Sequence, residues 1–399
     1  MSQPGLAASP KNIVTNPNTS SSPMKRLISL DVARGITICF MIMVNNNGGP
    51  GSWGFMNHAQ WNGLTPTDLV FPTFVFVMGV SVVFAFESRL SKGIAKAELA
   101  RHTVIRAIVL ICFGIIVNTF PFTHLDHLRP YGVLQRIGIC YLVVGLFYLY
   151  DNRASSKVVA LVVALVGYWV LVRFVPVPGW GTPGHDLPFM DVNRNLVSWI
   201  DQHIFPHHLY LYDPDHNVRD PEGMLSNLPA FGTALMGVLT GIWLRTQRTV
   251  QAKTLGLLAA CLTSLVIGYA WSLEFPLNKN MWTSSFVLVA GGYSLALLTF
   301  CYWTIEVMNW RKGWTFPWLV FGSNAIAAYM WSELTPGILY NIDIPSGAQH
   351  VNIVAWIAQN TIGHIPDRGW AAFAFSVSFA AFCFIPVWIL YRKKIFLKV

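Results

Sequence analysis

The amino-acid sequence predicts an all-α, polytopic membrane protein with about ten transmembrane helices and both termini in the cytoplasm. Of its 399 residues, 54% are apolar and only 11% are charged, whereas soluble domains contain about 25% charged residues. Apolar runs of roughly 20 residues, the length that a helix needs to cross the hydrocarbon core, recur along the chain. We therefore expect one membrane domain and no separate soluble domain.

Ten of these runs are long enough to span a bilayer. We place them at residues 27–46, 64–86, 103–119, 131–150, 157–175, 225–244, 254–273, 282–305, 315–334 and 370–391. A further run, residues 351–363, is too short to cross and is expected at the membrane interface. The sequence contains no internal repeat of the kind that relates the halves of many transporters.

The first 24 residues differ in composition from the rest of the chain. Residues 1–24 are rich in Ser, Asn and Pro, and we expect them to form a disordered cytoplasmic tail. Residues 25–399 form the transmembrane domain. All six cysteines lie inside apolar runs, so we expect neither a disulfide framework nor a cysteine metal site.

The placement of the basic residues gives the orientation. The formal net charge of +9 does not indicate nucleic-acid binding, because Lys and Arg lie mainly in short loops between apolar runs. Eighteen of the 27 fall on the side of the N-terminus, five on the opposite side and four within spans. Cytoplasmic loops carry such an excess, so this side is predicted to be cytoplasmic.

The longest polar segment, residues 176–224, is therefore predicted to lie outside. It contains seven acidic residues against Arg194 and Arg219. Two interpretations remain open: a solvated loop, or an outer vestibule whose negative charge attracts cations.

The segment between the first two spans, residues 45–68, holds the strongest candidates for chemistry. His58 is its one histidine, and an imidazole is suited to proton transfer near neutral pH. Asp68 has a structural explanation, since residues 65–68 read as a helix start with Thr65 as N-cap and Pro66 at N1. The same carboxylate can also accept the ring N–H of His58 and fix its tautomer.

Ionisable residues inside spans are costly and are treated as functional candidates. Arg34 can pair with Asp31, three residues earlier, whereas Arg136 has no acidic residue close in sequence. Glu333 ends a polar stretch of the ninth span. For each, a structural ion pair or interhelical hydrogen bond is an equal alternative. No metal site is expected, because Pro206 interrupts the histidines at 203, 207 and 208.

Six segments together resemble the heparan-α-glucosaminide N-acetyltransferase family. The most specific is residues 58–72, and the others are residues 26–35, the pair Asn45–Asn46, and residues 132–136, 220–223 and 322–325. The similarity covers roughly residues 25–391. It implies a bacterial member, located in the inner (cytoplasmic) membrane, that transfers an acetyl group from cytosolic acetyl-CoA to the amine of a glucosamine-type sugar outside.

The resemblance also implies roles for single residues. The family's active-site histidine falls on His58, its aspartate on Asp68 and its asparagine on Asn45, whose amide would stabilise the oxyanion. We expect acetyl-CoA to be bound by Arg34, Arg136 and Asn324. We expect the acceptor to be bound by Trp61, Asp220, Glu222 and Glu333.

Two classes of function stay open from the sequence. In the first, an acetyl-CoA-dependent N-acetyltransferase uses His58 as base or as acetyl carrier. In the second, a transporter or permease for sugars or cell-wall fragments binds its cargo with the same residues. The missing repeat and the lack of breaks within spans count modestly against transport. Whether two copies form a homodimer is also left open.

Overall fold

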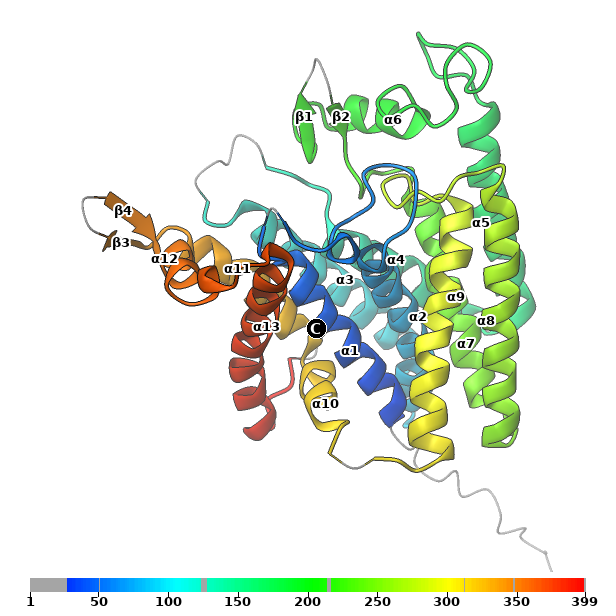
Figure 1. Ribbon diagram of the computed structural model, residues 1–399. Helices are drawn as coiled ribbons and strands as arrows, with labels where there is room; N and C mark the ends of the chain where they lie inside the picture. The colour runs from blue at the N-terminus through cyan, green and yellow to red at the C-terminus, as the bar shows by residue number, and fades with distance from the viewer. Residues whose placement is uncertain are drawn as a thin grey trace, which may run out of the picture.

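The chain is an all-α polytopic membrane protein, and its computed structural model shows helices that stand side by side in one bundle (Figure 1). The structure describes residues 27–49, 51–122, 128–213, 217–311, 313–346 and 349–397. The expected disordered tail, residues 1–24, lies outside this described part. Within it, nine helices are long and apolar enough to cross a membrane.

The long helices follow the expected spans closely. They are α1 (Ile28–Asn45), α2 (Val70–Leu90), α3 (Lys96–Thr119), α4 (Val133–Tyr150), α5 (Ala154–Phe174), α7 (Asn227–Arg245), α8 (Val250–Ser272), α9 (Ser284–Tyr302) and α13 (Arg368–Arg392). Two extend further: η2 (Pro66–Leu69) precedes α2 as a 3₁₀ turn, and η4 (Trp303–Val307) continues α9 as a π-helical turn. Helix α3 begins at Lys96, seven residues before the expected start at 103, because its first two turns are polar.

The ninth expected span, residues 315–334, is not one continuous helix. It consists of α10 (Phe316–Ser323) and α11 (Ala325–Leu339), which meet at Asn324. The expectation that no span is broken was therefore wrong. At this break the Asn324 side chain binds the C-terminal segment, since its Nδ2 donates to Ile395 O (3.0 Å) and its Oδ1 accepts from Leu397 N (3.0 Å).

The connecting segments at one end of the bundle carry the remaining elements. One group comprises η1 (Gly54–Met56), α6 (Leu196–Ile204), β1 (Leu211–Asp213) and β2 (Asn217–Arg219). A second group comprises β3 (Asp343–Ser346), β4 (Gln349–Asn352), α12 (Ile353–Asn360) and η5 (Ile362–His364). Each strand pair is a short antiparallel hairpin. Figure 1 places both groups at the end opposite to the start of α1 and the end of α13.

The helices divide into a buried inner set and an outer set. In the most apolar 18-residue stretch of α7, 72% of the residues are buried, compared with 17% in the corresponding stretch of α8. Helix α8 exposes Leu255, Leu262 and Val266, and α5 exposes Val159 and Val163. Apolar surface of this extent suits contact with lipid rather than water.

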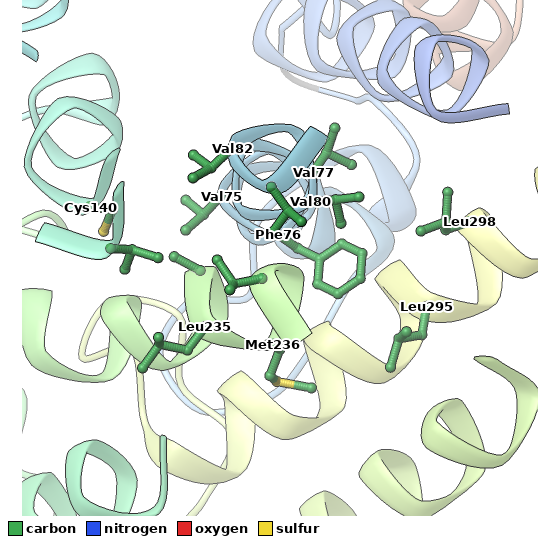
Figure 2. Close-up of a cluster of buried hydrophobic side chains, with 14 of the residues drawn as sticks. Val75, Phe76, Val77, Val80, Val82, Cys140, Leu235, Met236, Leu295 and Leu298 are labelled. Atoms are coloured by element: carbon green, nitrogen blue, oxygen red, sulfur yellow. The ribbon is translucent and has the colours of Figure 1, made fainter. Parts of the chain in front are cut away.

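The core of the bundle lies where α2 meets α7 and α9. Figure 2 shows Phe76 of α2 beside Met236 of α7 and Leu295 of α9, and all three are buried. Helices α2 and α7 approach closely because glycines face each other's backbone. A Cβ on Gly237 would lie 2.1 Å from the carbonyl oxygen of Phe76, and one on Gly79 would lie 2.2 Å from that of Ala234. Gly237 and Gly241 form a GxxxG pair, a spacing that allows such contact.

This packing predicts that Gly237→Ala destabilises the bundle, because the added methyl group meets backbone that cannot rotate away. We expect a loss of about 1–3 kcal/mol, typical of overpacking, seen as a lower melting temperature of the purified protein in detergent. Gly167→Ala in α5 is the control, since no atom lies within 4 Å of the added carbon. Equal melting temperatures for the two variants would contradict this account of the α2–α7 contact.

Candidate active site

The loop between α1 and η2 carries His58 and is held in a defined shape. Thr67 Oγ1 donates to Phe55 O (2.8 Å), and Thr65 Oγ1 donates to Asn57 O (2.7 Å). Met56 is buried beneath the loop. These contacts fix the backbone on both sides of His58.

His58 and Asp68 form the hydrogen bond that the sequence analysis expects. His58 Nδ1 lies 2.7 Å from Asp68 Oδ1, and the other carboxylate oxygen accepts from Ala59 N (3.1 Å) and Thr65 N (3.0 Å). The Asp68 side chain is 1% exposed, whereas that of His58 is 49% exposed. Asp68 completes a capping box with Thr65 as well, so the same carboxylate contacts both the helix start and the imidazole. An anionic partner on Nδ1 favours the tautomer that leaves the Nε2 lone pair free.

Lys279, in the connection between α8 and α9, is the third residue of this cluster. Its Nζ lies 3.2 Å from both Nδ1 and Nε2 of His58. A nitrogen in the ring plane at equal distance from both would overlap the carbon between them, so Nζ lies over the face of the imidazole. Partial burial lowers the pKa of the Lys279 ammonium, while the carboxylates of Glu222 and Asp68 act in the opposite direction.

The α8–α9 connection is fixed against the His58 loop by its own hydrogen bonds. Gly63 N donates to Leu277 O (2.8 Å), and Asn278 Nδ2 donates to Asn62 Oδ1 (3.1 Å). Asn278 Oδ1 accepts from Met281 N (2.8 Å), which shapes the turn itself. Two segments more than 200 residues apart therefore meet at His58.

Asp220 and Glu222, two of the residues expected to bind the acceptor, are buried and form ion pairs with Arg129. Arg129 Nε donates to Asp220 Oδ2 (2.7 Å), and its Nη2 donates to Asp220 Oδ1 (2.6 Å) and Glu222 Oε2. Burial acts to lower the pKa of Arg129, but these two carboxylates raise it well above its usual range. The pairs fasten the outer segment to the start of α4.

Arg136 continues this network below the outer segment. Its Nη2 donates to Gly223 O (3.2 Å) and to Ser226 Oγ, and its guanidinium lies 4.9 Å from the centre of the Trp282 ring. The side chain is almost completely buried. Arg136 therefore supports the folded outer segment and is not on the wall of the cavity described below.

Trp61 joins two outer segments. Its Nε1 donates to Met190 O (2.8 Å), and the guanidinium of Arg219 lies 4.9 Å from its ring centre. Trp61 is partly exposed, so one part of the ring remains open to a ligand.

Asn45 and Glu333 meet in a separate pocket. Asn45 Nδ2 donates to Glu333 Oε1 (2.8 Å). The pocket has a volume of about 740 Å³, and Arg368, Asn352 and Tyr340 contribute to its walls. The structure therefore pairs Asn45 with Glu333, while His58 and Asp68 are grouped with Lys279.

A second cavity, of about 290 Å³, lies between α1, α2, α3, α4, α10 and α11. Its walls are mainly apolar, and three arginines contribute to them: Arg34, Arg89 and Arg106. Arg34 donates to Ser81 Oγ (2.9 Å) and to Gly322 O (3.1 Å). Leu397 also lines this cavity, because Asn324 holds the C-terminal segment here through both polar atoms of its amide.

Comparison with known proteins identifies this arrangement. A family model described as "Heparan-alpha-glucosaminide N-acetyltransferase, catalytic" matches residues 26–275. The chain belongs to this family. It is 30% identical to the heparan-alpha-glucosaminide N-acetyltransferase of Mus musculus over 82% of the chain, and 30% identical to that of Homo sapiens over 94%. It spans 56% and 60% of the length of these relatives.

In this family member, two residues of the His58 cluster, His58 and Asp68, are predicted from the sequence, and the third, Lys279, is not. Asp68 is ten residues from His58 and carries a helix-start signature, whereas Lys279 is 221 residues away. The one available signal is a lysine in a short connection on the side that the charge count predicts to be outside, where basic residues are rare. No group of three His, Cys, Asp or Glu side chains suited to a metal ion occurs among the residues that the structure describes.

Asp201 of α6 gives the outer segment a pH-dependent stability. Burial raises the pKa of its carboxyl to about 7, with Asp220 acting in the same direction and the Met224 N–H bond (2.8 Å) opposing it. A carboxyl whose folded-state pKa is raised stabilises the fold fully below its unfolded pKa of about 4. This stability is lost as the pH rises through about 7.

We therefore predict that Asp201→Asn melts at a higher temperature than the wild type at pH 8. The difference should shrink as the pH falls toward about 4, because the wild-type carboxyl then becomes neutral as well. Melting curves at pH 4.5, 6 and 8 test this. The control is Asp186→Asn, since Asp186 is exposed and its pKa is lowered by bonds to Thr182 and His185. A difference that is independent of pH would refute the role of Asp201.

Proposed function

We propose that this chain is a transmembrane acetyltransferase that moves an acetyl group from cytosolic acetyl-CoA to the amine of a glucosamine-type sugar outside the membrane. The observation that carries the proposal is the hydrogen bond between the half-exposed His58 and the buried Asp68. Family membership supports the reaction class, and the curated relatives' names supply the amino-sugar acceptor. The inner membrane of a bacterium is the proposed location.

The chemistry follows from the free Nε2 of His58. In direct transfer, Nε2 takes a proton from the acceptor ammonium, and the amine nitrogen attacks the thioester carbonyl carbon. The C–N bond forms, the C–S bond breaks, and the leaving thiolate takes up a second proton that the attacking nitrogen loses. In the two-step alternative, Nε2 attacks the carbonyl carbon, the C–S bond breaks and the thiolate leaves. The amine then attacks the acetyl group on Nε2, and the bond from Nε2 to the acetyl carbon breaks. Both need Asp68, which fixes the ring and stabilises its positive charge.

The cavity near Arg34, Arg89 and Arg106 is the proposed binding site for the donor. Its lining residues on α2 run from Phe74 to Arg89, a length of about 22 Å at 1.5 Å per residue. An extended pantetheine arm, roughly 20 Å long, fits this length and its apolar walls. The arginines suit the phosphates of CoA, because the charged N–H groups of arginine are usual hydrogen-bond donors to phosphate. Asp68 lies six residues beyond Phe74, about 9 Å further along the same helix direction.

The outer pocket with Asn45 and Glu333 is the proposed place for the acceptor sugar. It offers amides, a carboxylate, the Arg368 guanidinium and the Tyr340 ring, which are groups that hydrogen-bond hydroxyls and pack against a sugar face. Asn45 would donate to the sugar or the oxyanion after exchanging its Glu333 partner. Transport is the weaker candidate, because the break at Asn324 is filled by the chain's own residues 395–397.

The catalytic role predicts that His58→Ala lowers acetyl transfer by about 10²–10⁴-fold, as expected for loss of a general base or nucleophile. Transfer of a radiolabelled acetyl group to glucosamine by purified protein measures this. His185→Ala is the matched control, because His185 forms a comparable pair with Asp186 (2.6 Å) on the exposed surface. Activity above about a tenth of wild type in a folded His58 variant excludes the role.

The sidedness predicts transfer between two compartments. In sealed proteoliposomes of one orientation, acetyl-CoA supplied only on the side of the α1 start should acetylate glucosamine supplied only on the opposite side. The reason is that the start of α1 and the His58 loop lie at opposite ends of the bundle (Figure 1). A requirement for both substrates on the same face would exclude a transmembrane reaction while leaving His58 as a catalytic residue.

A further inference from the structure

Lys279 occupies a position that fold stability alone does not explain. Its nearest polar partners are the two ring nitrogens of His58, each at 3.2 Å. Among the residues that the structure describes, no carboxylate oxygen lies within 4.0 Å of Nζ. A lysine that served to bind segments together would be expected to contact a carboxylate, as Arg129 does with Asp220. Here the ammonium lies against the imidazole instead.

Several elements together hold the charge at this place. The α8–α9 connection is fixed by Asn278 and Leu277 against Asn62 and Gly63 of the His58 loop. The carboxylates of Glu222 and Asp68 favour the charged form from two further segments, and the guanidinium of Arg136 opposes it. The fixed backbone of the α8–α9 connection and the attraction of the two carboxylates therefore keep the ammonium near the ring. Because the ammonium lies over the ring face, it does not block the lone pair of Nε2, which points outward in the ring plane.

We propose that Lys279 is the electrostatic partner of His58 in acetyl transfer, a fixed cation beside the ring that stabilises the oxyanion during the reaction. This inference rests on the proposed function and adds a residue to it. When the amine attacks the thioester carbonyl carbon, the carbonyl oxygen gains negative charge. When the C–S bond breaks, an electron pair on this oxygen re-forms the C=O bond. A fixed cation within reach of the His58 ring lowers the energy of this intermediate.

The position of Asn45 strengthens the assignment. Its amide nitrogen donates to Glu333, so oxyanion stabilisation by Asn45 requires a change of partner. Lys279 needs no such change, because its three N–H donors are not committed to a carboxylate. A preorganised donor is also the more effective one, since it does not reorient during the reaction.

The first test is Lys279→Met, which keeps the length of the side chain and removes the charge. We expect kcat to fall by about 10²–10³-fold, the usual cost of an oxyanion donor, with the KM for acetyl-CoA changed by less than about threefold. Lys279→Arg should recover part of the loss, because it restores a cation in a different shape. Lys253→Met, at the far end of α8, is the matched control and should retain full activity.

The pH profile separates an electrostatic role from a structural one. In Lys279→Met the cation is missing from the face of the imidazole, while Asp68, Glu222 and Arg136 stay in place. The acid limb of the kcat/KM profile of Lys279→Met should therefore move to higher pH. A variant that merely loosened the loop would lose activity without this displacement. An unmoved profile, or kcat above about a third of wild type, overturns the proposal.

If Lys279→Met folds poorly, the charge requirement can be tested by restoring a positive charge chemically at position 279. In a Cys112→Ala background, which removes the exposed native thiol, Lys279→Cys is alkylated with bromoethylamine to give a lysine analogue. Activity should return by at least about tenfold, whereas alkylation with iodoacetamide, which adds a neutral group, should restore nothing. Equal recovery with both reagents, or recovery with neither, refutes the charge requirement. The Cys112→Ala protein with Lys279 intact is treated with the same two reagents, which shows whether alkylation of the other cysteines changes activity.

Failure of this inference is distinguishable from failure of the proposed function. If the wild type does not acetylate glucosamine, the proposed function is wrong. If the wild type is active and His58→Ala is inactive, but Lys279→Met retains activity, only the role of Lys279 is wrong.

Discussion

The buried carboxylate of Asp68 is the interaction on which both the fold of the outer loop and the geometry of the site depend. One of its oxygens accepts from His58, and the other accepts from Ala59 N and Thr65 N. A buried carboxylate without such partners would be strongly unfavourable. The protein uses the same group to begin α2 and to orient the imidazole, so the helix start and the position of His58 cannot vary independently.

The spans were predictable because the bilayer imposes one length and one composition on each of them. Nine expected spans appear as continuous helices, and the boundaries differ mainly where polar residues extend a helix beyond its apolar part, as at Lys96. The break at Asn324 was not predictable, because the groups that satisfy it come from residues 395–397. A tertiary contact, and no local signal, decides that break.

The site was predictable to the extent that it is local in sequence. His58 and Asp68 lie ten residues apart, and the capping pattern fixed the position of the carboxylate before any tertiary contact was known. Asp220 and Glu222 carry charges that suit a ligand, yet both pair with Arg129, which a sequence alone does not place beside them. Lys279 was missed for the same reason, since its approach to His58 depends on how two distant connections pack.

The C-terminal segment forms part of one wall of the cavity near Arg34. Leu397 contributes to that wall, and two hydrogen bonds to Asn324 hold the segment in place. Such bonds contribute about 0.5–1.5 kcal/mol each, so releasing the segment costs far less than separating two packed helices. The glycine contacts between α2 and α7 do not involve this segment, so its release would leave them intact. The cavity of about 290 Å³ is thus bounded by helices on most sides and by this short segment at Leu397.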